Sequence, residues 1–146
     1  MRLSATLFLI ILTCLSCKKE SNGTLDGKWK MVRYYDRNTN ALYSKPASSE
    51  NVFLEFDGNN FIAYSDNNES CDGTYTLNGD GITFNTINSY FTAATDGWSD
   101  MFFWAIQACQ LQSTYPCKPS ELKYSPLNQI RINTVLRMDI MLTRVQ

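Results

Sequence analysis

Residues 71–84 have the sequence CDGTYTLNGDGITF, and this stretch decides the fold class. From Cys71 to Leu77, apolar or small residues alternate with polar ones, a period of two that is typical of a strand with one buried face. Residues 78–81, Asn-Gly-Asp-Gly, favour a tight turn, and residues 82–84 begin a return strand. We therefore predict an antiparallel hairpin near the centre of the chain.

Six more short runs outside this hairpin have strand-like composition and are separated by turn residues. A long polar connection at residues 36–51, which contains Pro46, divides the first run from the second. Together with the hairpin, the runs predict about eight strands. The six runs are residues 28–35, 52–56, 61–64, 122–124, 130–133 and 136–145.

Residues 98–111 break the strand pattern. They are mostly apolar, contain few β-branched residues and follow Thr95-Asp96-Gly97, which suits the start of a helix. An antiparallel sheet of this many strands buries one face best by closing, because closure also removes its exposed edges. We therefore predict an all-β fold, an antiparallel barrel of about eight strands with one helix inserted before the last three strands. An open sandwich is the alternative.

The composition excludes several classes of function. The chain has 146 residues, 44% apolar and 18% charged, which fits one globular domain. Its net charge of −1 argues against a nucleic-acid partner. It contains no histidine, which excludes a Ser-His-Asp triad, a Cys-His pair and a His-ligated zinc site. Since no spaced pair of carboxylates stands out either, we expect no enzyme, no catalytic residue, no metal ion and no cofactor.

The N-terminus has the features of a secretory signal. Arg2 precedes an apolar run at residues 7–12. This run is much shorter than the roughly 20 apolar residues that a membrane-spanning helix needs. An uncleaved membrane anchor is the alternative to a signal that is removed.

Ser16 and Cys17, at the end of this apolar segment, resemble a bacterial lipobox. The resemblance implies that the Cys17 thiol receives diacylglycerol and that the chain is cleaved before it. Lipidation at Cys14 and ordinary secretion are the alternatives. Residues 1–16 would then be the signal peptide, residues 17–26 the acylated cysteine with a flexible tether, and residues 27–146 the barrel domain. The protein would be anchored to a membrane of the bacterial envelope, outside the cytoplasm, because two or more acyl chains hold a protein stably.

Gly27-Lys28-Trp29, at the start of the first predicted strand, resembles the Gly-x-Trp motif of lipocalins. In that family the Trp seals the closed end of the barrel, and an Arg near the end of the last strand packs across it. Arg144 is the matching residue here. The resemblance therefore implies that Gly27, Trp29 and Arg144 close the barrel.

Further segments resemble the lipocalin-like domains that small bacterial lipoproteins carry. The Thr-Asp-Tyr motif of typical lipocalins is absent, and the predicted helix precedes the last three strands instead of following the barrel. The resemblance implies a fold and not one chemistry. The segments are residues 53–64, 73–80 and 141–145.

A second resemblance is to the META domain of small envelope proteins, which also has a Cys before a Gly-x-Tyr strand. Cys71 stands in that position here, and Cys109 would be the second cysteine of that family. With Cys17 acylated, three thiols remain. A Cys109–Cys117 disulfide would close a short loop after the helix; a Cys71–Cys109 disulfide, supported by the META resemblance, is the alternative. The remaining thiol is expected to be buried and inert.

Aromatic residues make up 13% of the chain and are concentrated at residues 98–104. We expect a non-catalytic protein that binds a small apolar or amphipathic ligand against Tyr75, Trp98, Phe102 and Trp104. The helix could instead fill one barrel end with its aromatic residues in the core, or present them to a protein partner. Two other classes of function remain open: a protein-binding or hydrolase-inhibitor lipoprotein that uses the loops at residues 36–51 or 66–70, and a structural envelope component.

Overall fold

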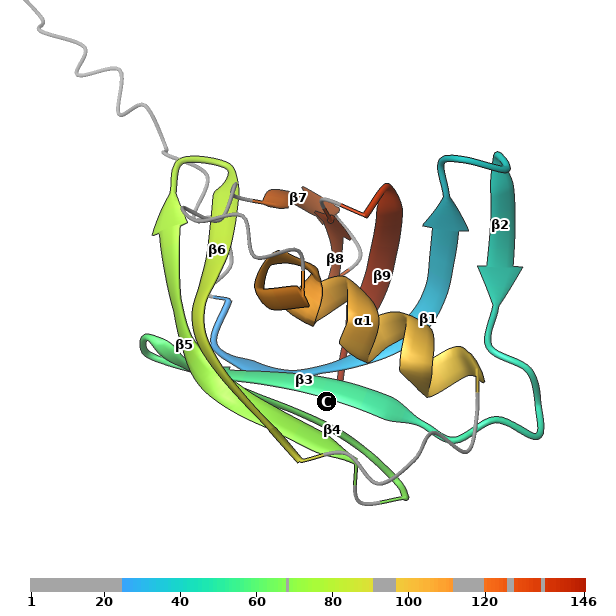
Figure 1. Ribbon diagram of the computed structural model, residues 1–146, viewed down its shortest axis with the longest axis horizontal. Coiled ribbons are helices and arrows are strands. Elements are labelled where there is room, and N and C mark those ends of the chain that lie inside the picture. Colours follow the sequence, from blue (N-terminus) through green and yellow to red (C-terminus); the bar gives the residue numbers. More distant parts are fainter. Residues whose placement is uncertain (1–24, 68, 91–96, 112–119, 126–127, 135) are drawn as a thin grey trace, which may run out of the picture.

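The hairpin predicted from residues 71–84 is formed by β5 (Ser70–Asn78) and β6 (Gly81–Tyr90), which pair from Asn78 opposite Gly81 to Ser70 opposite Tyr90. The structure is a computed structural model, shown in Figure 1. This hairpin is its longest described strand pair. The structure describes residues 25–67, 69–90, 97–111, 120–125, 128–134 and 136–146. The hairpin continues into β4 (Asn60–Ser65) and, through it, β3 (Val52–Asp57).

Eight of the strands close into an antiparallel ring. β1 (Gly27–Asp36) pairs with β3 along one edge and with β9 (Met138–Arg144) along the other. The ring then runs through β8 (Gln129–Asn133) and β7 (Ser120–Ser125) to β6. The predicted closed barrel is confirmed, and the last three strands follow the helix as expected.

The prediction of a polar loop at residues 36–51 is wrong in part. This segment contains a ninth strand, β2 (Ala41–Ser44), which pairs with the second half of β1 from Arg33 opposite Ser44 to Asp36 opposite Ala41. The turn between them places Asn40 at a φ of 56°, a conformation that Asn tolerates well. Four residues are too few to show an alternation, so the strand was not visible in the sequence.

Closure between β6 and β7 is short. Within the described residues, two pairs join them, Gly81 with Glu121 and Ile82 with Ser120. The Leu122 N–H adds a hydrogen bond to the carbonyl oxygen of Asp80, at 2.6 Å. From Thr83 onward β6 continues with β5 as its described partner, and the helix lies beside this part of β6 (Figure 1).

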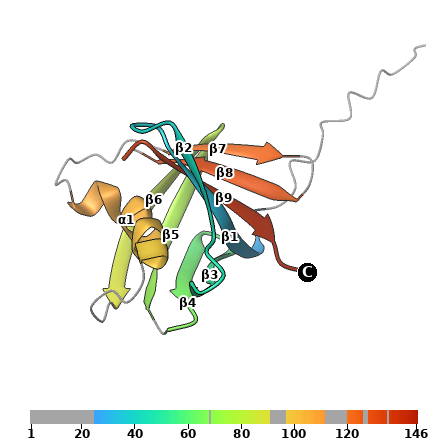
Figure 2. The same cartoon turned by 90° about the vertical axis from the view of Figure 1, so that its right-hand side faces the viewer.

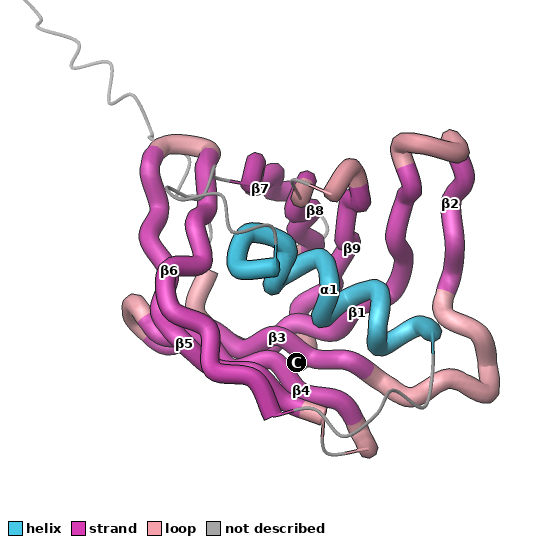
Figure 3. Tube along the Cα trace, in the orientation of Figure 1, coloured by secondary structure: helices cyan, strands magenta, loops and turns pink. Residues whose placement is uncertain are grey.

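The helix α1 (Gly97–Leu111) occupies one end of the barrel. It crosses the ring between β6 and β9, with strands on both sides of it (Figures 1 and 3). Figure 2 shows the barrel turned by 90°. In this view α1 lies at one end, and the start of β1 and the C-terminus lie at the other end. We call these the helix end and the closed end.

The core fills the barrel between the two ends. Its fully buried side chains come from inward positions of nearly every strand and from α1. Large members that define it are Met31, Leu54, Phe56, Ile82, Phe102, Ile130, Ile132, Ile140 and Leu142. Within the described residues, no helix has the length and apolar character needed to cross a membrane.

Candidate functional site

The closed end is sealed by Trp29 and Arg144, which lie opposite each other on β1 and β9. Trp29 is 2% exposed, and its Nε1 donates a hydrogen bond of 2.7 Å to the carbonyl oxygen of Leu25. The Arg144 guanidinium lies over the indole, 4.5 Å from the ring centroid, in cation–π geometry. Its Nη1 also donates to the carbonyl oxygen of Asp26, at 2.8 Å. The structure thus brings together the two residues that the lipocalin resemblance pairs.

Gly27 makes room for this seal. Its φ of +116° lies in a region that residues with a side chain rarely adopt. A Cβ there would come within 3.0 Å of Nη1 of Arg144. Gly27 therefore supports the seal through its backbone conformation and its small size.

Tyr75 belongs to the closed end rather than to the helix end. Its hydroxyl donates to the carbonyl oxygen of Gly58 at 2.7 Å, and its ring meets Phe56 edge-on, with centroids 4.8 Å apart. Burial, with a smaller effect from the negative charge of Asp26, raises the pKa of Tyr75. The structure therefore does not group Tyr75 with the aromatic residues of the helix, as a shared ligand site would require.

Trp98 anchors the first turn of α1 to the barrel wall. It is 4% exposed, and its ring lies 5.6 Å from that of Tyr34 on β1. Tyr34 in turn stacks on Tyr43 of β2, with centroids 4.6 Å apart and planes 17° from parallel. Burial is the main cause that raises the pKa of Tyr34. Sequence analysis missed Tyr34 and Tyr43, because their stacking depends on the unpredicted strand β2.

Phe102 continues the apolar face of the helix. It is fully buried and meets Phe103 edge-on, with ring centroids 5.4 Å apart. Since Trp98 and Phe102 are one turn apart, the barrel end presents an aromatic wall made by α1. We call Tyr34, Trp98 and Phe102 the aromatic wall.

Trp104, which we expected in the ligand site, does not belong to this wall. It is 62% exposed, the largest value among the large apolar side chains described as exposed. Its helix position explains this, because Trp104 lies seven residues, or two turns, after the exposed Gly97. Among the side chains described in α1, residues 97–107, Gly97 and Trp104 are the exposed ones.

A polar cluster lies beside the aromatic wall at the first turn of the helix. Ser99 is fully buried, and its Oγ donates to Oε1 of Glu50 at 2.8 Å. The other carboxylate oxygen of Glu50 accepts the backbone N–H of Asn67, at 3.1 Å. One carboxylate therefore ties the loop after β2, the turn after β4 and the first turn of α1 together. A negative charge is favourable near a helix N-terminus.

Cys71 lies in the same interior region and faces the helix. It is fully buried, and its thiol shares a hydrogen bond with the Gln107 side chain. Burial, with a smaller effect from the Asp72 charge, raises the pKa of Cys71 to about 12. The thiol is free, so the alternative disulfide with Cys109 is not formed. The side chains of Cys109 and Cys117 lie outside the described residues.

The interior at the helix end is thus mixed in character. The aromatic wall supplies apolar surface there, and Glu50, Ser99, Cys71 and Gln107 supply polar groups. These side chains therefore combine apolar contact with hydrogen bonding in one region. Among the described residues, no three Asp, Glu or Cys side chains gather in a way that could hold a metal ion.

Comparisons with known proteins agree with the fold. No family model matches the chain, and no curated protein matches it by sequence. A protein from Burkholderia xenovorans, solved by NMR, has a TM-score of 0.59 at 11% identity and covers 83% of each chain. A lipocalin-like protein from Bacteroides uniformis has a TM-score of 0.53 at 16% identity, over 84% of this chain and 100% of the other. The fold is therefore that of a lipocalin-like barrel, and at these identities the likeness concerns the fold alone.

Proposed function

We propose that this protein is a non-catalytic lipoprotein of a bacterial envelope whose barrel holds a small apolar or amphipathic ligand at the helix end. One observation carries the proposal. At this end the barrel is filled by α1, which is attached to the strands by side-chain contacts, whereas the strands are joined by backbone hydrogen bonds. Strand pairing closes the rest of the ring. Side-chain contacts can rearrange around a guest molecule without breaking a backbone ladder, so this end is the one suited to binding.

The chemistry of the helix end indicates the ligand class. Trp98 and Phe102 offer aromatic surface, which favours a chain or ring without charge. Ser99 and Gln107 offer hydrogen-bonding groups at other positions of α1. A molecule with one apolar part and one uncharged polar group, such as a monoacylglycerol, matches both kinds of surface.

Native mass spectrometry of residues 18–146 tests the ligand. The protein is purified from the periplasm of an expression host and then mixed with monoolein, an uncharged monoacylglycerol. We expect a stoichiometric extra mass that is lost on denaturation. Phe102→Ala should reduce the occupied fraction, whereas Trp104→Ala should not, because Trp104 faces outward. Equal effects of the two variants, or no bound mass under any condition, would contradict the proposal.

The anchor is a separate part of the proposal and has its own test. Wild type and a Cys17→Ala variant are expressed as full chains and partitioned between detergent and water. Wild type is expected in the detergent phase and the variant in the aqueous phase, since triacylation gives stable membrane binding. Equal partitioning of the two proteins would rule out lipidation at Cys17, and a loss seen instead in Cys14→Ala would move the anchor there.

A protein-binding role is the second candidate, favoured by β2. This short strand exposes Leu42 and Tyr43, at 54% and 41%, beside the stacked Tyr34. Exposed apolar side chains on an edge strand can anchor a partner. Capture of an envelope protein that Leu42→Ser and Tyr43→Ser together abolish would support this candidate over the ligand carrier.

A further inference from the structure

The charged residues of the chain divide the barrel into two halves. Residues 46–117 contain no Lys or Arg, although they contain nine Asp and Glu. This segment forms β3, β4, β5, β6 and α1. Every Lys and Arg that the structure describes lies on β1, β7, β8 or β9, in the turns that flank them, or at Lys45 after β2.

The pairing of β1 with β9 joins the two basic ends of the sequence into one wall. Arg33 lies opposite Met141, Met141 opposite Arg131, and Arg131 opposite Lys123. Directly opposite residues in an antiparallel sheet point to the same face. Arg33, Arg131 and Lys123 therefore form one row across four strands, and we call the outer face of β1, β9, β8 and β7 the basic wall. Arg131 and Lys123 are 40% and 55% exposed, and Nζ of Lys123 lies 3.1 Å from Oε1 of the half-exposed Glu121, an ion pair at the edge of the basic wall.

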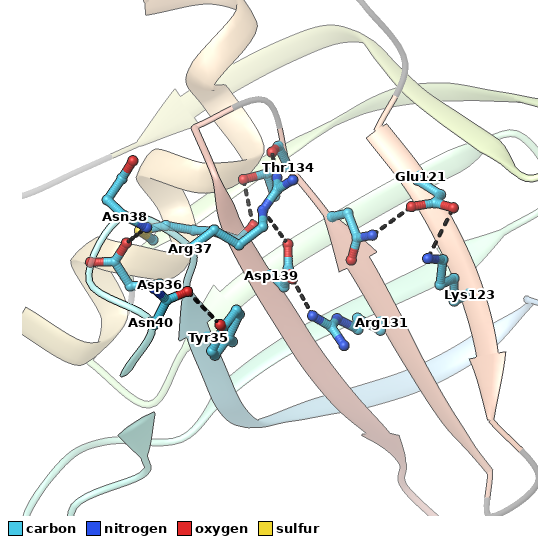
Figure 4. A network of polar contacts seen from close by, with 12 residues as sticks. Tyr35, Asp36, Arg37, Asn38, Asn40, Glu121, Lys123, Arg131, Thr134 and Asp139 are labelled. Carbon is cyan, nitrogen blue, oxygen red and sulfur yellow. Dashed lines mark hydrogen bonds and ion pairs between the residues drawn. The ribbon is translucent and has the colours of Figure 1, made fainter. Parts of the chain in front are cut away.

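The next row of the basic wall fixes the arginines in place (Figure 4). Asp139 is only 1% exposed and lies between Arg37 and Arg131; its Oδ1 is 3.0 Å from Nε of Arg37. Arg37 also donates to the carbonyl oxygen of Thr134 at 2.7 Å, and the Arg131 guanidinium lies 5.8 Å from the Tyr35 ring centroid. One buried carboxylate thus orients two guanidinium groups and leaves a net positive charge.

We propose that the basic wall docks on the surface of a bilayer that contains anionic phospholipid. A wall with cations in a row complements a plane of phosphate charges, while the acidic half of the barrel is repelled by it and faces away. Each Lys or Arg close to such a surface strengthens binding, and the attraction acts within about 8 Å at physiological ionic strength.

The start of β1 is where the chain leaves the barrel toward Cys17. A tether from Cys17 to Gly27 spans at most about 35 Å, so an anchored chain keeps β1, a strand of the basic wall, close to the bilayer. The closeness of β1 to the bilayer rests on the proposed anchor. The charge of the basic wall does not depend on the anchor, and its effect on membrane binding can be measured on a chain without the lipid.

Vesicle co-sedimentation of residues 18–146 tests the wall separately from the anchor. This segment contains every described core residue and every strand of the barrel, so we expect it to fold without residues 1–17. The vesicles contain phosphatidylcholine alone or phosphatidylcholine with phosphatidylglycerol. We expect binding only to the anionic vesicles and a loss of binding as salt is raised.

Two charge-matched double variants sharpen the test. Arg33→Gln with Lys123→Gln removes two positive charges from the basic wall and should weaken binding about 10- to 30-fold. Thr76→Glu with Asn85→Glu adds two negative charges to exposed positions of β5 and β6, gives the same net charge and should weaken it far less.

Equal weakening by both variants, or equal binding to both kinds of vesicle, would overturn the proposal. Salt-sensitive self-association without vesicle binding would also overturn it, since the basic wall would then bind the acidic half of a second copy. The ligand-binding experiment probes the interior of the barrel, and the Cys17 experiment probes the thiol. If either fails, the vesicle result still tests the basic wall.

Discussion

The two ends of the barrel are closed in different ways. At the closed end, Trp29 and Arg144 sit on paired strands, and both donate hydrogen bonds to backbone carbonyl oxygens. At the helix end, α1 is attached through the packing of Trp98 and through the Ser99–Glu50 hydrogen bond. The first end is part of the sheet, and the second is an addition to it.

This difference assigns different roles to the two ends. The backbone hydrogen bonds at the closed end break only when a whole strand leaves the sheet. The closed end therefore contributes mainly to the stability of the whole domain. A helix attached by side-chain contacts can detach while the strands stay paired. Segments that open locally in this way are the ones that move when binding proteins take up a ligand. Buried aromatic residues can therefore stabilise the fold at one end and serve a ligand at the other.

The largest expected effect comes from removing the seal at the closed end. Trp29→Ala should lower the free energy of unfolding by about 3–5 kcal/mol, because a fully packed indole is deleted. Urea denaturation measures the change. Trp104→Ala is the matched control and should change it by no more than about 0.5 kcal/mol, since that indole is exposed. Similar losses in both variants would mean that the closed end has no special part in stability.

The barrel wall between the two ends should tolerate no side chain at Gly73. An added Cβ would lie 1.6 Å from the carbonyl oxygen of Thr86 and 3.1 Å from the Phe61 ring, so β5 and β6 must move apart. Gly73→Ala should cost about 1–3 kcal/mol in the same assay. Gly97→Ala, where nothing lies within 4 Å of the added atom, is the control. A neutral Gly73→Ala would show that the hairpin adjusts freely.

Glu50→Gln should affect the helix end alone. It weakens the hydrogen bonds to Ser99 and to the Asn67 N–H, and hydrogen bonds to a charged group are worth more than neutral ones. We expect hydrogen exchange of the α1 amides to become about ten-fold faster while β1 and β9 keep their protection. Glu55→Gln, on the outer side of β3, is the control. Faster exchange at both ends would mean that α1 opens only with the whole barrel.

Cys71 gives a smaller and pH-dependent effect. Its pKa is raised from 9.0 to about 12, so the folded chain keeps the proton longer than the unfolded chain does. The stability from the neutral thiol is complete below pH 9 and falls as the pH rises toward 12. Between pH 8 and 10, wild type should lose about 1 kcal/mol more than Cys71→Ala. An equal loss in both proteins, or fast labelling of native Cys71 by a thiol reagent at pH 8, would contradict burial of the thiol.

Local patterns in the sequence were sufficient for the strands with a clear alternation and for the helix. The predicted ranges 28–35 and 98–111 lie within one residue of β1 and α1 at each boundary. β2 was missed because four residues carry no periodicity, and its partner stack with Tyr34 was missed with it.

Side-chain placement at the helix end was harder to predict. Trp98, Phe102 and Trp104 are equally apolar in the sequence, and only the packing of α1 in the ring buries two of them and exposes the third. Glu50 and Ser99 are 49 positions apart, so nothing local pairs them. The combination of aromatic and polar side chains at the candidate site therefore comes from the topology of the barrel.

The most direct test of the ligand site is NMR of uniformly ¹⁵N-labelled residues 18–146 during titration with monoolein. Backbone and indole resonances report on both ends of the barrel in one spectrum. The account predicts saturable shifts of Trp98, Phe102 and Ser99 at the helix end, with Trp29 and Arg144 at the closed end unchanged. Shifts confined to the closed end or to the outer strands, or no shifts at saturating monoolein, would contradict a ligand site beneath α1.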